Sequence, residues 1–147
     1  MAEKFSGVHW MLATPFNEDE SIDLPGLGNL VDKAVSSGCK GMVCLGVTGE
    51  AARLTDGERY HLADKVIQDS EGLPVTVGTT AGSTVAAIER SKEAEKLGAA
   101  AVMVSPPPMG KPNPEAVIGH YSRLADAIDI PIVIQDYPST SGVHMSP

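Results

Sequence analysis

The chain has few aromatic residues, few cysteines and an excess of acidic over basic side chains. Aromatic residues make up 4% of its 147 residues, and the two cysteines, Cys39 and Cys44, are too few and too closely spaced for a disulfide framework or a zinc site. The 19 acidic and 11 basic residues give a formal net charge of -8, which would repel nucleic acid and an anionic membrane surface. We therefore expect neither as a partner, and we interpret both cysteines as reduced thiols in the core.

Long apolar runs and metal-binding patterns are also missing from the sequence. No run reaches the length of a membrane span, and the first seven residues lack the apolar region of a signal peptide, which predicts a cytoplasmic protein. The four histidines form neither a His-x-x-x-His pattern nor a spacing with carboxylates that would hold a metal. A hydrophobic content of 42% over 147 residues is enough for one sizeable core.

What the sequence does contain is a repeated alternation of apolar and amphipathic segments. The predicted strands are 8–13, 41–45, 74–78, 99–104 and 130–135. A helix is predicted after each of the first four, running to about Gly38, Ser70, Gly98 and Ile128. The predicted caps of these helices are Asp23, Thr55, Ser83 and Asn113. Near-continuous apolar strands that alternate with helices indicate an α/β fold with a parallel sheet.

The loops that follow these strands are rich in Gly, Thr and Pro, and α/β proteins build their sites on that side of the sheet. None contains Gly-x-Gly-x-x-Gly or a Walker pattern, which favours a barrel over a nucleotide-binding sheet. Ser146-Pro147 has the form of a cap and first position of one more helix. We predict a (β/α)8 TIM barrel truncated after strand five, with 1–147 as the N-terminal part of one barrel domain.

The stretch Leu45-Gly46-Val47-Thr48-Gly49-Glu50 is the clearest candidate for a binding loop. It joins the second predicted strand to a helix, so that its amides and the Thr48 hydroxyl could converge on a small anion such as a carboxylate. A tight turn that binds nothing is the alternative, and the spacing alone does not decide between them. For Glu50 we expect a structural hydrogen bond to the loop, and for Trp10 and Phe16 a place in the core.

Several motifs in order along the chain resemble one family. They are Ala13-Thr14-Pro15-Phe16, Gly46-Val47-Thr48-Gly49-Glu50, Gly78 with Gly82, Val104-Ser105-Pro106-Pro107 and Pro138-Ser139-Thr140-Ser141-Gly142. Together they are similar to motifs of the dihydrodipicolinate synthase and N-acetylneuraminate lyase superfamily of class I aldolases, over nearly the whole chain. The resemblance implies a lyase or hydro-lyase (aldolase or dehydratase) that forms a Schiff base with a 2-oxo acid such as pyruvate. It also implies a homo-oligomer, a dimer or a tetramer, that needs no metal or organic cofactor.

The same resemblance assigns roles to particular residues. It places Val47, Thr48 and Gly49 on the substrate carboxylate, and Gln135 and Tyr137 near the substrate after strand five. The Schiff-base lysine falls beyond Pro147, so this chain is expected to hold no catalytic residue. We expect solvated surface charges for Lys4, Lys33, Lys40, Lys65, Lys92, Lys96 and Lys111.

Four departures bear on which family member this is. Where the family motifs have a threonine, this chain has Val47, and where they have tyrosines it has Pro108 and Gln135. Thr140 stands where the dihydrodipicolinate synthases have an arginine. Glutamine also occupies the position of Gln135 in the branch of the 2-keto-3-deoxy-sugar-acid dehydratases, such as those of L-2-keto-3-deoxyarabonate, although Pro108-Met109 departs from that branch. The alternatives are 4-hydroxy-tetrahydrodipicolinate synthase itself and a non-catalytic half barrel that binds a carboxylate or serves in assembly.

Tyr137 could supply the missing phenol. Residues two apart in a strand share a face, so Tyr137 would lie above Gln135 if both belong to the fifth strand. Alternatively the strand has already turned at Asp136, and Tyr137 packs on Pro138.

Overall fold

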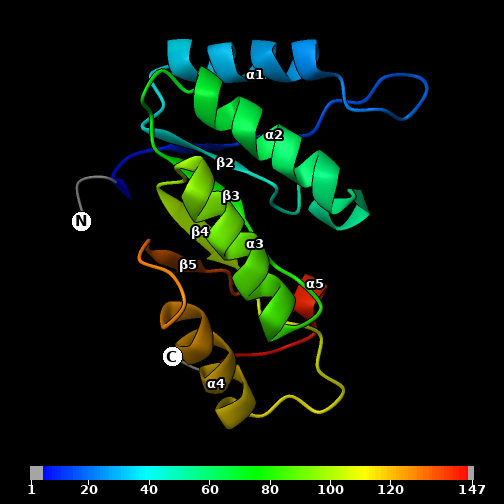
Figure 1. Ribbon diagram of the computed structural model, residues 1–147, viewed down its shortest axis with the longest axis vertical. Coiled ribbons are helices and arrows are strands. Elements are labelled where there is room, and N and C mark those ends of the chain that lie inside the picture. The colour runs from blue at the N-terminus through cyan, green and yellow to red at the C-terminus, as the bar shows by residue number, and fades with distance from the viewer. Residues whose placement is uncertain (1–4, 146–147) are drawn as a thin grey trace.

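A single parallel sheet organises the molecule, which is described by a computed structural model for residues 5–145. Its strands are β1 (His9–Met11), β2 (Gly41–Cys44), β3 (Val75–Gly78), β4 (Ala101–Val104) and β5 (Ile132–Ile134). They lie in sequence order, and each neighbouring pair is parallel (Figure 1). This is the order of strands in the wall of a (β/α)8 barrel. The predicted α/β fold is therefore confirmed.

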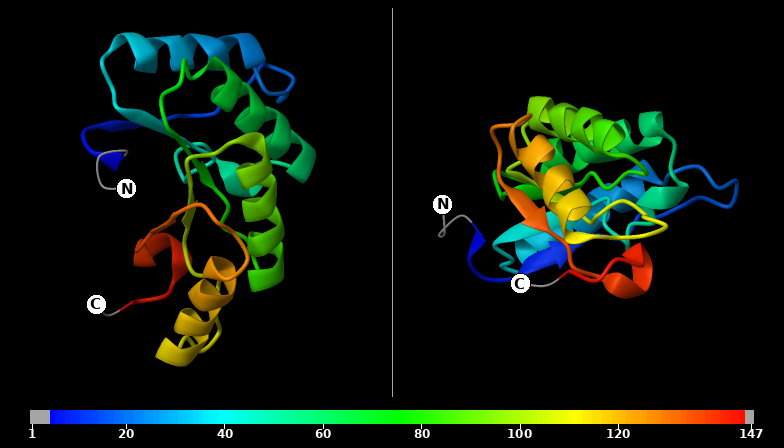
Figure 2. Two further views of the ribbon diagram at one scale, coloured as in Figure 1. Left: turned by 60° about the vertical axis from the view of Figure 1, so that its left-hand side comes forward. Right: turned by 90° about the horizontal axis from the view of Figure 1, so that it is seen from below.

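Four longer helices cover one face of this sheet, as Figures 1 and 2 show. They are α1 (Leu24–Ser36), α2 (Asp56–Asp69), α3 (Thr84–Leu97) and α4 (Pro114–Ala125), and each contacts the next. Two short helices, η2 (Ala51–Arg53) and α5 (Pro138–Ser141), follow β2 and β5. None of the helices in the described chain is both long and apolar enough to cross a membrane.

All four predicted helix caps are present. The side chains of Asp23, Ser83 and Asn113 each accept a backbone N–H from the first turn, and Thr55 forms a reciprocal capping box with Glu58. Each cap satisfies an amide that the helix itself cannot, so these starts are set locally. The helix boundaries that depend on these caps agree with the sequence.

The core lies between the sheet and the helices. Alternate strand residues point toward the helices, where the core includes Met42, Cys44, Val75, Val77, Val102 and Val104. The helices contribute Leu27, Val31, Leu62, Val66 and Leu124. The opposite strand face is also buried in β2, β3 and β4, which explains why these strands are continuous apolar runs.

Several predicted boundaries and placements were wrong. All five strands are shorter than predicted, and β5 ends at Ile134, so Gln135 follows the strand and Tyr137 directly precedes α5. Helix α4 ends at Ala125 instead of Ile128, because the chain turns there with the Ala127 amide donating to the Leu124 carbonyl at 3.1 Å.

Two side chains expected in the core lie nearer the surface. Phe16 is 38% exposed, because the loop after it folds back and pairs Phe16 with Ile22. Cys39 is only half-buried beside Ser37, whereas Cys44 is fully buried as predicted, and both thiols are free. Lys4 and Ser146-Pro147 lie outside the described residues.

Candidate functional site

The predicted binding loop lies at the carboxyl end of β2 and is bracketed by two residues in an unusual conformation. Leu45 and Glu50 have positive φ angles of 56° and 51°, a region that residues with a bulky side chain rarely adopt. Between them the Gly49 amide donates to the Gly46 carbonyl at 3.1 Å, and the Glu50 amide donates to the Val47 carbonyl at 3.0 Å. The loop is therefore a double turn with left-handed residues at both ends.

Three donors in this loop remain open. Val47 is 49% exposed and Thr48 is also exposed, and no hydrogen bond within residues 5–145 uses either amide or the Thr48 hydroxyl. Gly49 differs, because its amide is used inside the turn. Of the three residues assigned to the carboxylate, Val47 and Thr48 hold the available donors, and Gly49 closes the turn that presents them. Their contact with a substrate stays a prediction.

β1 and the residues that follow it restrain the loop on one side. The hydroxyl of Thr14, which is 7% exposed, donates to the Gly49 carbonyl at 2.7 Å across 35 residues of sequence. Gly46 approaches the same strand, since a Cβ there would lie 2.8 Å from the sulfur of Met11. The motif that contains Thr14 thus has a structural role in fixing the loop after β2.

The third strand holds the loop from the other side through a close backbone contact. A Cβ at Gly78 would lie 2.0 Å from the Leu45 carbonyl oxygen, a distance that no side chain tolerates. Glycine is required at this position because the two backbones meet there.

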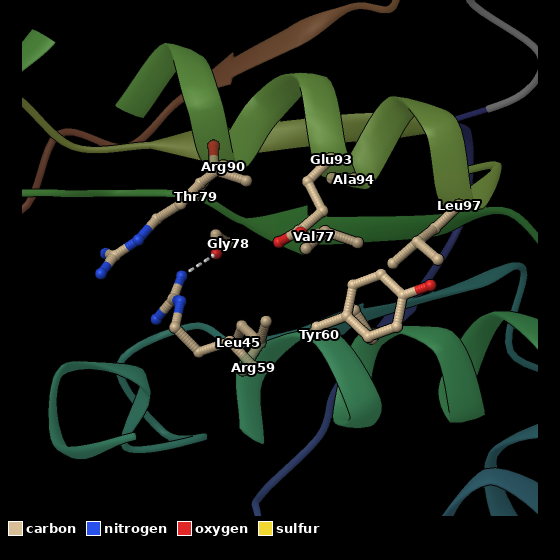
Figure 3. A pocket seen from close by; sticks show the side chains of 11 residues that line it. Leu45, Arg59, Tyr60, Val77, Gly78, Thr79, Arg90, Glu93, Ala94 and Leu97 are labelled. Atoms are coloured by element: carbon tan, nitrogen blue, oxygen red, sulfur yellow. Dashed lines mark hydrogen bonds between the residues drawn. The ribbon is translucent and has the colours of Figure 1, made fainter. Parts of the chain in front are cut away.

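Arg59, on α2, is a buried residue that the sequence reasoning missed. Its guanidinium donates to the carbonyl of Ala51 and to that of Gly78, both at 2.7 Å. Figure 3 shows the second of these bonds. Burial, with a smaller effect of the neighbouring Arg90, lowers the pKa of Arg59 to about 10, so the side chain stays charged at neutral pH. Its spacing of three and four residues from the core residues Leu62 and Ala63 is the signal that could have placed it inside.

Arg90, on α3, lies near Arg59 but has different hydrogen-bond partners. It pairs with Asp56 at 2.8 Å and donates to the Thr80 carbonyl at 2.9 Å. Figure 3 shows both guanidinium groups at the end of the α2–α3 pocket nearest Gly78. The cavity that Arg59 and Arg90 line between these helices measures about 20 Å³, room for roughly one water molecule. This pocket is a packed interface and no substrate site.

The strand-five residues lie at the same edge of the sheet but have fewer contacts. The Ser105 hydroxyl donates to the Gln135 side-chain oxygen at 3.0 Å, and the Ser105 amide donates to the Thr80 hydroxyl at 2.9 Å. Tyr137 is 46% exposed and precedes α5 without a side-chain cap. Tyr137 therefore does not continue the strand alternation from Gln135, and its contact with substrate stays a prediction.

The phenol of Tyr121, a second tyrosine in this region, is used in a structural hydrogen bond. It donates to the Val104 carbonyl at 3.0 Å, and burial, followed by the charge of Asp136, raises the pKa of Tyr121 to about 12. This group connects α4 to β4 and is poorly suited to proton transfer.

The lysines of the described chain lie at or near the surface, as predicted. Lys65 pairs with Asp69 on α2, and the other described lysines are exposed: Lys33, Lys40, Lys92, Lys96 and Lys111. Burial raises the pKa of Cys44 to about 12, so its thiol is inert. Within residues 5–145 no three His, Cys, Asp or Glu side chains are grouped to hold a metal. The histidines are dispersed over β1, α2, α4 and the segment after α5.

Parallel βα units in sequence order, with structured loops at the carboxyl ends of the strands, define the chain as part of a (β/α)8 barrel. The dihydrodipicolinate synthetase family matches residues 4–147, and the chain belongs to this family. A relative from Thermomicrobium roseum, named 4-hydroxy-tetrahydrodipicolinate synthase, is 41% identical over 142 residues, which cover 96% of this chain and 47% of that relative.

Solved structures give the same result. The dihydrodipicolinate synthase of Acinetobacter baumannii, solved with pyruvate, has a TM-score of 0.92 and 33% identity, over 95% of this chain and 48% of that one. YagE, a prophage protein of the family from E. coli K12 that was also solved with pyruvate, has a TM-score of 0.89 and 29% identity, over 94% and 47% of the two chains. The chain thus spans about half the length of the relatives it matches.

Proposed function

We propose that this chain supplies the carboxylate-binding part of an enzyme that forms a Schiff base with a 2-oxo acid. The whole protein would be a lyase or hydro-lyase, with a lysine outside this chain as its nucleophile. The observation that carries the proposal is the loop after β2, where the amides of Val47 and Thr48 and the Thr48 hydroxyl are open donors. A carboxylate accepts hydrogen bonds from such donors. The pyruvate held by two structurally similar relatives is a small 2-oxo acid that has this group.

Binding the carboxylate would fix the position of the neighbouring ketone. A fixed ketone meets the lysine amine with less loss of entropy than a free one, and the iminium formed then withdraws electrons from the adjacent carbon. Gln135 and Tyr137, at the end of β5, would contact the remainder of the substrate. From the sequence we retain a cytoplasmic homo-oligomer that needs no metal or organic cofactor.

The second candidate is 4-hydroxy-tetrahydrodipicolinate synthase, which the name of the Thermomicrobium roseum relative favours. The residues argue for a dehydratase or aldolase instead, because Val47, Pro108 and Gln135 lack the hydroxyls of a proton relay. Thr140 likewise replaces the arginine expected for the aldehyde substrate. A non-catalytic carboxylate-binding module is the third candidate, which the absence of a buried lysine among residues 5–145 favours.

Reduction with borohydride tests the Schiff base directly. The whole protein and the 147-residue chain would each be incubated with pyruvate, or with a 2-keto-3-deoxy sugar acid, then reduced and weighed by mass spectrometry. We expect a covalent adduct on the whole protein and none on the chain alone. An adduct on the chain would contradict the assignment of the lysine outside it, and no adduct on either would favour the non-catalytic module.

Turnover separates the two enzymatic candidates. Loss of water from a 2-keto-3-deoxy sugar acid supports the dehydratase, whereas consumption of pyruvate only in the presence of the synthases' aldehyde supports the synthase. A Tyr137→Phe variant should form the adduct at the normal rate but turn over more slowly. Unchanged turnover would remove Tyr137 from the proposed site.

A further inference from the structure

Arg59 is the only lysine or arginine buried within residues 5–145, with 5% of its surface exposed. A buried cation is costly unless it is well paired, and most such groups face a carboxylate. Arg59 faces two backbone carbonyls instead, those of Ala51 and Gly78. The nearest acidic group of its own helix turn, Asp56, is already paired with Arg90.

The two carbonyls stand on either side of the binding loop. Ala51 directly follows Glu50, the left-handed residue that ends the loop, and Gly78 is the residue whose backbone meets Leu45, the left-handed residue that begins it. One rigid guanidinium therefore connects the two ends of a strained segment through α2. Figure 3 shows the bond to Gly78 and places Leu45 beside Arg59.

Backbone strain of this kind persists only when surrounding contacts enforce it, at a cost of roughly 1–3 kcal/mol for each residue. Thr14, which follows β1, fixes Gly49, but its bond lies inside the loop and does not restrain the two ends. The guanidinium restrains both, and its planar fork loses little further entropy in doing so.

We propose that Arg59 is a positioning residue, which holds the loop after β2 in the conformation that points the Val47 and Thr48 donors at the substrate carboxylate. This inference rests on the proposed function. Both carbonyls that Arg59 binds belong to backbone outside the loop, at Ala51 and Gly78, so Arg59 would act on the substrate through the loop. It also places a buried positive charge against that backbone, in a chain whose formal net charge is -8.

The test compares variants of the whole protein in borohydride trapping with pyruvate and with acetone, a ketone that has no carboxylate. Arg59→Met removes both bonds and the charge at similar length, and Arg59→Lys keeps the charge with a single donor group. Arg53→Met is the matched control, because Arg53 ends η2 directly after the same loop but is exposed, and within residues 5–145 it pairs with Glu50 alone, at 3.2 Å.

We expect Arg59→Met to raise the pyruvate concentration for half-maximal trapping by about tenfold or more, as misplacement of binding groups does, with acetone trapping unchanged. Arg59→Lys should fall between Arg59→Met and the unmodified protein, and Arg53→Met should match the latter. If Arg59→Met does not fold, the Arg59→Lys result decides by itself.

Three outcomes would overturn the inference. If the pyruvate concentration for half-maximal trapping is unchanged in both Arg59 variants, Arg59 is not a positioning residue, and the proposed function is unaffected. An equal loss of trapping with pyruvate and acetone assigns Arg59 to general stability. Failure of the unmodified protein to trap pyruvate refutes the proposed function, and the inference with it.

Discussion

The loop after β2 and the segment after β5 lie at the same edge of the sheet, but they are held in different ways. Three different contacts restrain the first: the Thr14 hydroxyl, the Arg59 guanidinium and the backbone of Gly78. The second is joined to its neighbours by the bond from Ser105 to Gln135 and by the Gln135 amide, which donates to the Val104 carbonyl at 2.9 Å. Its other side-chain bonds, between Ser141 and Val143, lie within the segment, and its short helix is uncapped.

The strands that precede these two segments, β2 and β5, also differ in burial. β2 is buried throughout, whereas in β5 Val133 is 41% and Ile134 is 55% exposed. The donors proposed for the carboxylate are therefore pre-organised by residues of this chain. Gln135 and Tyr137, by contrast, have little around them that fixes their orientation.

The largest effect should come from Gly78→Ala. The added methyl group would lie 2.0 Å from the Leu45 carbonyl oxygen, so the backbone must move, and we expect about 3 kcal/mol or more of lost stability. Gly82→Ala is the control, because no atom lies within 4 Å of the added Cβ. Urea unfolding of the whole protein measures both. Equal stability of the two variants would mean that the loop can shift freely and is not pre-organised.

Thr14→Val should have the next largest effect. It leaves the Gly49 carbonyl buried without its donor, which typically costs about 1–3 kcal/mol. Thr14→Ser retains the hydroxyl and should lose less stability than Thr14→Val. The pyruvate concentration for half-maximal trapping should rise in the valine variant only. An equal rise in the serine variant, which keeps the hydroxyl, would show that loss of the hydroxyl is not the cause.

Ser105→Ala tests the less restrained side. The bond to Gln135 is only partly buried, so its loss should cost about 0.5–1 kcal/mol in urea unfolding, less than Thr14→Val. A cost as large as that of Thr14→Val would remove the contrast between the two sides.

His120 provides the smallest effect, which appears only as pH is lowered. Its ring accepts or donates one hydrogen bond, with Thr84 at 2.9 Å, and its Nε2 is buried without a partner within the described chain. Burial first, and then Arg123, lowers the pKa of His120 below its ordinary value of 6.5. Its unfolded form therefore binds a proton more readily, so the stability it contributes is complete above about pH 6.5 and is lost as pH falls through the lowered pKa.

His120→Gln should flatten this slope of stability against pH, measured by urea unfolding between pH 7 and the onset of acid unfolding. His61→Gln, at an exposed position on α2, is the control and should leave the slope unchanged. An unaltered slope in His120→Gln would assign the acid sensitivity to other groups.

The sequence predicted the features that depend on near neighbours. The caps at Asp23, Thr55, Ser83 and Asn113 and the alternation of strands and helices rest on residues a few positions apart. Glu50 bonds to the loop through its backbone amide, which closes the turn at Val47, whereas its carboxylate pairs with Arg53.

Features that depend on distant partners could not be predicted in this way. The acceptor of Thr14 is 35 residues away, and that of Arg59 at Gly78 is 19 residues away. The end of β5 was also missed by one residue, because the apolar pattern alone does not show where the chain turns toward α5. These long-range contacts are the ones that shape the candidate site.

The hydrogen bonds that hold the loop after β2 join Thr14 to Gly49, Ala51 to Arg59, and Arg59 to Gly78. All of them close within the first 78 residues. During synthesis a nascent chain therefore has every one of these partners before β4 and β5 leave the ribosome. The donors proposed for the carboxylate can thus be set at an early stage of translation, whatever is later added around Gln135 and Tyr137.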